Sequence, residues 1–274
     1  MLNLVSDSSC DLISGELNSP YARLTVAPMC LHVGGQDYPD TPALDIPALL
    51  AMLAHHPSSS ACPSPAAYAA AFEQGEETVC VTISSQLSGS YNAAMAARDL
   101  VLAEHPEKKI FVLDSRATSG VMILLLRKAA ELAEKGLPFE ELCEALQKYQ
   151  RSTRICFTLE HFDNLVKNGR MPPLAGTLLL GIRIVAEATA EGTIRVAKKA
   201  RGEAHTARAI AQLMSDAKDC TGSHVIITHC QNPEGAERLR NAILDRLPVK
   251  AVEILPCRGL TSFYAMDKGL ILSY

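Results

Sequence analysis

A dense group of hydroxyl side chains lies between an apolar segment and an alanine-rich segment in the N-terminal half. Residues 79–83 are apolar, residues 93–97 are mostly alanine, and the hydroxyls between them come from Ser84, Ser85, Ser88, Ser90 and Tyr91. A connecting turn needs fewer hydroxyls than this. A helix start carries free N–H groups and a partial positive charge, so hydroxyls placed there are suited to binding an anion.

Two more predicted strands end in polar side chains of the same kinds. The first apolar run ends at Val5 and continues into Ser6-Asp7-Ser8-Ser9, and the run at 110–113 continues into Asp114-Ser115. In open parallel sheets, ligands bind beyond the carboxyl ends of the strands. Each of these residues alone is explained by the capping of a helix or turn, but three such ends at one sheet edge favour a binding site.

The segment from Ser58 to Phe72 is the second candidate. It passes through Pro63 and Pro65 into a run of alanines, with Ser64 suited to cap the helix and Pro65 to its first turn. Alanine leaves space where leucine would fill it. Two interpretations stay open: close packing of a helix on a sheet, or a slot into which a long apolar ligand fits.

Motifs of familiar catalytic sites are absent from the sequence. There is no G-x-S-x-G turn, no P-loop and no G-x-G-x-x-G after a strand. The adjacent pair His55-His56 and the separated pair His224 and His229 both lack the spacing of a zinc site, so we expect no metal. Arg170 stands at a predicted helix end, where it is either a solvated cation or a residue that faces an anion.

The composition limits the class of protein. The chain has 274 residues, 48% hydrophobic and 20% charged, which is enough for one large or two modest α/β domains with a full core. A net charge of −4 without a dense Lys/Arg stretch argues against nucleic-acid binding. The sequence has no apolar stretch of about 18 residues and no basic signal-peptide start, so we expect no stable membrane insertion.

The cysteines indicate the compartment. Nine of them occur singly along the chain, and no C-x-x-C pair is present. An odd, dispersed set argues against a disulfide framework and indicates reduced thiols. Reduced thiols are typical of the cytoplasm, which is where we expect the protein to be.

Short β-type runs alternate with helical segments, which is the pattern of an α/β fold with a largely parallel sheet in the first half. The predicted strands are 2–5, 24–33, 78–83, 110–113, 154–158, 182–188, 193–198, 224–228, 249–255 and 270–273. The predicted helices are 46–55, 89–103, 119–136, 138–149, 159–167 and 203–218, with others beginning at 64, 172 and 232. A boundary near Arg151-Ser152 divides the chain into two domains, 1–152 and 153–274.

Five short motifs occur in an order that resembles the DegV family of bacterial fatty-acid-binding proteins. They are DSSCDL (7–12), SACPSP (60–65), SSQLSGSY (84–91), DSRATSG (114–120) and LVKNGRM (165–171). The segments HCQNPEGAERL (229–239) and RGLTSFYAMDKGLILSY (258–274) are also similar to the family. The resemblance spans nearly the whole chain, and the order of the motifs makes it specific.

The resemblance implies a two-domain α/β fold: an N-terminal parallel α/β domain, a C-terminal α/β domain, and a long-chain fatty acid buried in a tunnel between them. Ser60 and Ser88 match the family's carboxylate-binding hydroxyls. Further candidates for contact with the head group or a partner are Ser9, Ser85, Gly89 and Arg170. The partner in this family is a separate fatty acid kinase that makes acyl phosphate for phospholipid synthesis. The chain itself would then have no catalytic residue, metal or cofactor.

The chain departs from the family pattern at several positions. Ser60 replaces a threonine, and Cys62 replaces a glutamine. The stretch Arg183-Ile184-Val185 replaces Lys-Pro-Ile, and Cys257 stands where the family has a late histidine. These differences bear on the kinase partnership more than on lipid binding.

An enzyme is the alternative hypothesis. The chain would be a serine hydrolase or a phosphoryl-transfer subunit that uses Ser88. A nucleophilic serine needs a base within hydrogen-bond reach. His229 is the candidate base, but no acid that would orient it is evident. A third hypothesis is a structural or regulatory partner protein.

Overall fold

The N-terminal half is built on a parallel sheet. The computed structural model of the protein describes residues 1–17, 19–172 and 182–274. Its parallel strands are β1 (Leu2–Asp7), β2 (Ala22–Ala27), β6 (Glu77–Thr82) and β7 (Lys109–Asp114). They pair in the order β2-β1-β6-β7. Because all of them run the same way, their polar carboxyl ends meet at one edge of the sheet.

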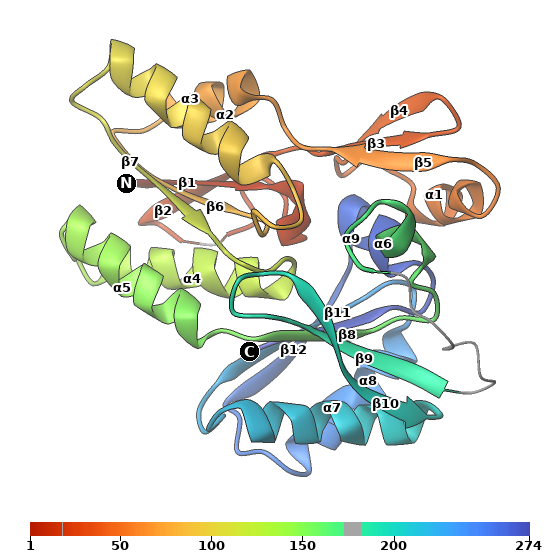
Figure 1. The fold of residues 1–274 in the computed structure, drawn as a ribbon. Helices are drawn as coiled ribbons and strands as arrows, with labels where there is room; N and C mark the ends of the chain where they lie inside the picture. The colour runs from red at the N-terminus through yellow and green to blue at the C-terminus, as the bar shows by residue number, and fades with distance from the viewer. Residues whose placement is uncertain (18, 173–181) are drawn as a thin grey trace.

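Helices cover both faces of this sheet (Figure 1). They are α2 (Pro65–Phe72) and α3 (Ser90–Glu104) on one face, and α4 (Gly120–Glu134) and α5 (Phe139–Ser152) on the other. Ser64 caps α2 as expected, since its hydroxyl accepts a 3.2 Å hydrogen bond from the Ala67 N–H.

A mixed six-stranded sheet forms the C-terminal half. Its strands are β8 (Ile155–Thr158), β9 (Ile182–Ala188), β10 (Ile194–Arg201), β11 (His224–His229), β12 (Ala251–Pro256) and β13 (Leu270–Ser273). The order is β10-β9-β8-β13-β11-β12, and only the β11–β12 pair is parallel among these described strands. Its outer face is covered by α7 (Glu203–Ala217) and α8 (Pro233–Leu244).

A smaller three-stranded antiparallel sheet stands beside these layers, at the upper right of Figure 1. Its strands are β3 (Cys30–Val33), β4 (Gln36–Pro39) and β5 (Ser58–Ala61), in the order β4-β3-β5. The short helices near it are η1 (Ser8–Cys10), α1 (Ile46–Leu53), α6 (Asp163–Lys167) and α9 (Gly259–Ala265). Helix α9 packs against α1, α6, η1 and β3, so it joins the C-terminal half to this sheet.

The main core lies between the two large sheets, around α4. Strand side chains alternate between faces, and the alternation is visible in both sheets. In β1, Leu4 belongs to this central core and Val5 to the core beneath α2 and α3. In β11, Ile226 faces the central core and Ile227 the core under α7 and α8. The order of layers is therefore helices, sheet, α4 and α5, sheet, helices.

The predicted α/β class and the parallel first sheet are confirmed. The single strand predicted at 24–33 is wrong, because Pro28 separates β2 from β3 and the two strands join different sheets. The helix predicted at 159–167 covers only Asp163–Lys167, since residues 159–162 form a connection in which Phe162 packs on Phe157. Strand β5 and the short helices η1 and α9 were not predicted from the sequence.

Two predictions are not decided by the structure. The helix predicted to begin at Pro172-Pro173 extends outside the described residues. The two large sheets fall on either side of residue 152, but the division into domains 1–152 and 153–274 stays a prediction.

Within the described ranges, no helix is both long and apolar enough to cross a bilayer. All nine cysteines lie in these ranges as free thiols.

Gly120 allows α4 to approach the C-terminal sheet closely. A Cβ at this position would lie 2.8 Å from the side chain of Ser273 and 3.0 Å from that of Ile226. Gly120→Ala should therefore lower the free energy of unfolding by roughly 1–3 kcal/mol through overpacking. Urea denaturation measures this, with the exposed Glu134→Ala in the same helix as a control. Equal stability of Gly120→Ala and the parent would contradict this close packing.

Candidate functional site

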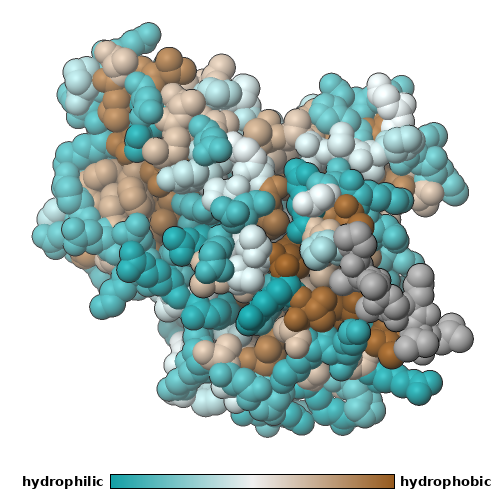
Figure 2. Space-filling model, viewed as in Figure 1, coloured by the Kyte–Doolittle hydropathy of each residue, from teal (hydrophilic) through white to brown (hydrophobic). Residues whose placement is uncertain are grey.

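An apolar cavity of about 320 Å³ lies between the two halves of the chain. This volume is within the range of roughly 300–1,000 Å³ that is common for small-molecule sites. Its apolar wall includes Met29, Ile83, Leu87, Ile155, Phe157, Leu159, Leu165, Ile194, Leu260 and Ile271. In Figure 2, brown apolar residues gather along the hollow where the upper and lower halves meet. The cavity therefore suits a mostly apolar ligand.

Ser60 lines the cavity from β5 and contacts a residue of the C-terminal half. Its hydroxyl lies 2.9 Å from the Tyr264 hydroxyl, which α9 brings to the same wall. If the phenol donates to Ser60, the Ser60 proton is free to point toward a ligand. Sequence reasoning missed Tyr264, because the structure brings it beside Ser60 from more than two hundred residues away.

Ser88 and Gly89 line the same cavity at the start of α3. The Ser88 hydroxyl accepts a 3.3 Å hydrogen bond from the Ser90 N–H, so its own proton stays available for an acceptor in the cavity. Gly89 is the N-cap of α3, and a Cβ there would approach the Cys62 sulfur to 3.5 Å. The start of a 15-residue helix next to two hydroxyls favours a negatively charged group.

Arg170 also lines the cavity, and it joins the two halves of the chain. Its Nε donates a 3.0 Å hydrogen bond to the Leu87 carbonyl, and its Nη1 donates to the Asn168 carbonyl. Gly169 has a φ of +71°, a conformation that glycine adopts readily and that allows the chain to turn after α6. The guanidinium therefore lies beside the segment that carries Ser88.

Several hydroxyl side chains at the sheet edge surround the carboxylate of Asp7. Asp7 is fully buried and accepts hydrogen bonds from the Ser9 hydroxyl, the Ser90 hydroxyl at 2.6 Å and the Ile83 N–H at 3.0 Å. Tyr68 bonds to Ser90 at 2.6 Å and lies 3.4 Å from Asp7. Burial raises the pKa of Asp7, and these hydrogen bonds oppose the rise.

The remaining predicted residues lie outside the cavity wall. Ser9 is buried against Asp7 and the sulfur of Met122. Ser85 donates to Asp114 through its hydroxyl at 2.5 Å and its N–H at 3.2 Å. The structure thus brings Ser60, Ser88, Gly89 and Arg170 to one cavity, whereas Ser9 and Ser85 support neighbouring segments. What each contributes to ligand or partner binding stays a prediction.

Two buried carboxylates of the N-terminal half hold the start of α9. Asp40 accepts hydrogen bonds from the Gly259 N–H at 3.0 Å and the Leu260 N–H at 2.8 Å. Asp11 accepts a 2.7 Å bond from the Arg258 N–H. Burial raises the pKa of both carboxyl groups. Helix α9 carries Leu260 and Tyr264 of the cavity wall, so these contacts position part of the site.

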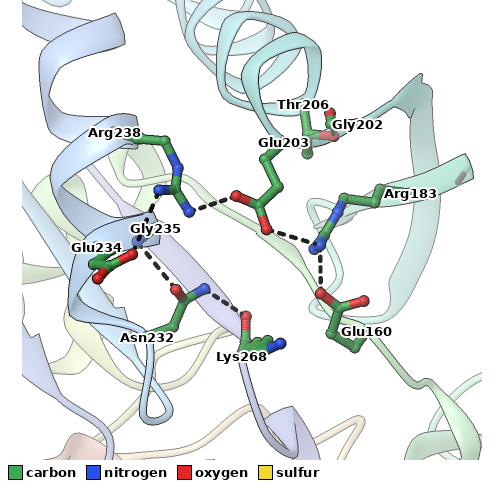
Figure 3. A network of polar contacts seen from close by, with 10 residues as sticks. All are labelled: Glu160, Arg183, Gly202, Glu203, Thr206, Asn232, Glu234, Gly235, Arg238 and Lys268. Atoms are coloured by element: carbon green, nitrogen blue, oxygen red, sulfur yellow. Dashed lines mark hydrogen bonds and ion pairs between the residues drawn. The ribbon is translucent and has the colours of Figure 1, made fainter.

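Arg183 is one of the residues at which the chain departs from the family pattern. Its side chain belongs to an ion-pair network on the C-terminal sheet (Figure 3). Arg183 contacts Glu160 and Glu203, and Glu203 also contacts Arg238 of α8. None of these four residues lines the cavity. Ion pairs at the surface contribute little singly, but this network links β9, α7 and α8 to one another.

The layered fold with an apolar cavity between its sheets and hydroxyls at a helix start defines an α/β binding protein. The model of the DegV family, described as an uncharacterised protein family, matches residues 1–268, and the chain belongs to this family.

Known proteins similar to this chain include a DegV domain-containing protein of Streptococcus pneumoniae, 37% identical over 99% of this chain and 98% of that protein. The crystal structure of the S. pneumoniae fatty acid kinase (Fak) B3 protein, loaded with linoleic acid, is 36% identical with a TM-score of 0.94. A DegV family protein from Eubacterium eligens, loaded with heptadecanoic acid, is 32% identical with a TM-score of 0.94. Each of these two structures covers 100% of this chain, which covers 99% of each of them.

Asp11 gives the fold a testable pH dependence. Burial raises the pKa of Asp11 from its ordinary value of 3.8 to about 7, so the folded protein keeps a proton that the unfolded chain has lost. Stability should therefore fall between about pH 4 and about pH 7, by at most about 1.4 kcal/mol per pH unit from this group. Above about pH 7 the contribution levels off.

The variant Asp11→Asn isolates this effect, since the amide oxygen still accepts from the Arg258 N–H but cannot ionise. Urea unfolding of both proteins at several pH values should show the parent losing stability relative to the variant as pH rises. A constant difference across this range would show that Asp11 ionises normally in the folded protein.

Proposed function

We infer that this protein binds a long-chain fatty acid in the cavity and presents the carboxylate to a separate fatty acid kinase. The apolar cavity has hydroxyls and a helix start on its wall, in a chain 36% identical to a fatty acid kinase B3 protein loaded with linoleic acid. The acyl chain occupies the apolar space, and its carboxylate lies near Ser60, Ser88 and the start of α3.

The acyl chain and the carboxylate of the ligand contribute to the binding free energy in different ways. Burying about fourteen methylenes at roughly 0.8 kcal/mol each gives on the order of 11 kcal/mol before the entropy costs of binding. Each charge-assisted hydrogen bond to the carboxylate adds roughly 1.5–3 kcal/mol. The acyl chain therefore supplies most of the affinity, and the polar wall fixes the direction in which the acid lies.

In this account the protein carries no chemistry of its own. The alternative, a hydrolase that uses Ser88, needs a base within hydrogen-bond reach. Of the described residues on the cavity wall, none is a histidine. The candidate base His229 instead accepts a 3.1 Å hydrogen bond from the Asn232 N–H at the start of α8. The acid is therefore held and presented here, and the kinase supplies the chemistry.

We propose that Arg170 contacts the fatty acid kinase, together with Gly89 at the start of α3, which lines the same cavity. Arg170 connects the loop after α6 to the Ser88 segment through the Leu87 carbonyl. Ser9 and Ser85 are proposed to act indirectly, by holding Asp7 and Asp114 in place. We further propose that residues 1–152 and 153–274 are the two domains, and that the nine free thiols place the protein in the cytoplasm.

Replacing the two cavity hydroxyls tests the carboxylate site. Ser88→Ala removes one charge-assisted hydrogen bond, which should cost roughly 1.5–3 kcal/mol, or about ten- to a hundred-fold in fatty-acid affinity. Ser60→Ala acts on the same carboxylate, so the two losses should not add. The double variant should retain weak binding and should bind a fatty alcohol about as well as the acid.

Arg170→Ala is the matched comparison, because the residue lines the same cavity. It should leave acyl affinity within about twofold while lowering phosphorylation of the bound acid by a cognate kinase.

Melting temperatures of the same samples, including Ser88→Ala, show whether Ser88 acts only as a helix cap. If Ser88→Ala lowers the melting temperature without lowering affinity, the carboxylate site is misassigned.

A further inference from the structure

Three potential metal ligands come together on the outer face of the β3–β4 hairpin. In β3, Leu31 and Val33 are buried, so Cys30 and His32, which alternate with them, are on the solvent side. The strand register places Asp37 of β4 directly opposite His32. Side chains of directly opposed residues lie on the same face of a sheet. A thiol, an imidazole and a carboxylate therefore share one small area.

The distances within this group are short. The ligand atoms of Cys30, His32 and Asp37 all lie within 4.8 Å of one another, and the His32 Nδ1 is 2.5 Å from the Asp37 carboxylate. Zinc binds sulfur at about 2.3 Å and nitrogen or oxygen at about 2.0–2.2 Å. Two ligands of one tetrahedral zinc are then roughly 3.3–3.6 Å apart. The present separations of up to 4.8 Å are close to these values.

The ligand types favour zinc over calcium and magnesium. Calcium and magnesium take oxygen ligands, whereas zinc takes sulfur, nitrogen and oxygen together. All nine cysteines are within the described residues, and Cys30 and Cys62 are the two that are not buried. Cys62 lines the apolar cavity. Cys30 instead has a histidine and a carboxylate within ligand distance.

We propose that Cys30, His32 and Asp37 bind one Zn²⁺ ion, with solvent as the fourth ligand. The metal joins β3 to β4 on the side opposite to the buried Leu31. Strand β3 also pairs with β5, where Leu31 is opposite Ser60 of the cavity wall. The ion thereby stiffens the sheet that presents Ser60. This site does not depend on what the cavity binds.

Cobalt titration of the reduced, chelator-treated and desalted protein tests the proposal. Co²⁺ should bind once per chain and give a thiolate-to-cobalt charge-transfer band that one equivalent of Zn²⁺ removes. Cys30→Ser should abolish the band, and Asp37→Asn should weaken binding at least about tenfold. The controls Cys62→Ser and His55→Ala, a cysteine and a histidine outside the group, should leave the titration unchanged.

Protection from alkylation is a second measurement that needs no variant of the site. Zn²⁺ should slow iodoacetamide modification of Cys30 in the unaltered protein but not that of Cys62, as read by peptide mass spectrometry. Absence of the charge-transfer band, an equal titration of Cys30→Ser, or unprotected Cys30 would overturn the proposal. If a variant fails to fold, the protection experiment on the unaltered protein still decides.

Discussion

The position of α9 depends on hydrogen bonds from its first N–H groups to carboxylates of the other half of the chain. Asp40 accepts from Gly259 and Leu260, and Gly259 must be glycine because a Cβ would lie 2.3 Å from the Asp40 carboxylate oxygen. Free N–H groups at a helix start favour a negative partner, and burial makes that partner hard to replace. Helix α9 carries Tyr264, which meets Ser60 on the cavity wall, so this contact helps to position part of that wall.

The same chemistry recurs at the edge of the parallel sheet. Asp7 accepts hydrogen bonds from Ser9, Ser90 and the Ile83 N–H, and Asp114 accepts from Ser85, so several of the hydroxyls at this edge stabilise carboxylates of the protein itself. Ser88 is different, because its hydroxyl lines the cavity and accepts only from the Ser90 N–H among the contacts of the described residues. The hydroxyls thus have two roles. Ser85 and Ser90 hold the carboxylates at the strand ends, and Ser88 lies at the helix start, where it can reach a ligand.

Local chemistry made much of the fold predictable from the sequence. The alternation of β-type and helical segments and the Ser64 cap identified most elements, and the parallel strand ends were expected at one edge. The motif order led to Ser60 and Ser88, which the structure places on one cavity.

The features that were not predicted depend on contacts between residues far apart in the sequence. Tyr264 reaches Ser60 only after α9 packs on the small sheet, and Asp40 carries no signal beyond a polar residue near a turn. The Cys30, His32 and Asp37 group exists only through the register of β3 and β4, which spacing along the chain does not reveal.

The most direct test of the account is mass spectrometry of the freshly purified protein after denaturation. We expect a long-chain fatty acid at close to one molecule per chain, released only on unfolding. We also expect delipidated protein to take up labelled palmitate or oleate. No extractable acyl chain and no uptake of either acid would contradict the assignment of the cavity as a fatty-acid site.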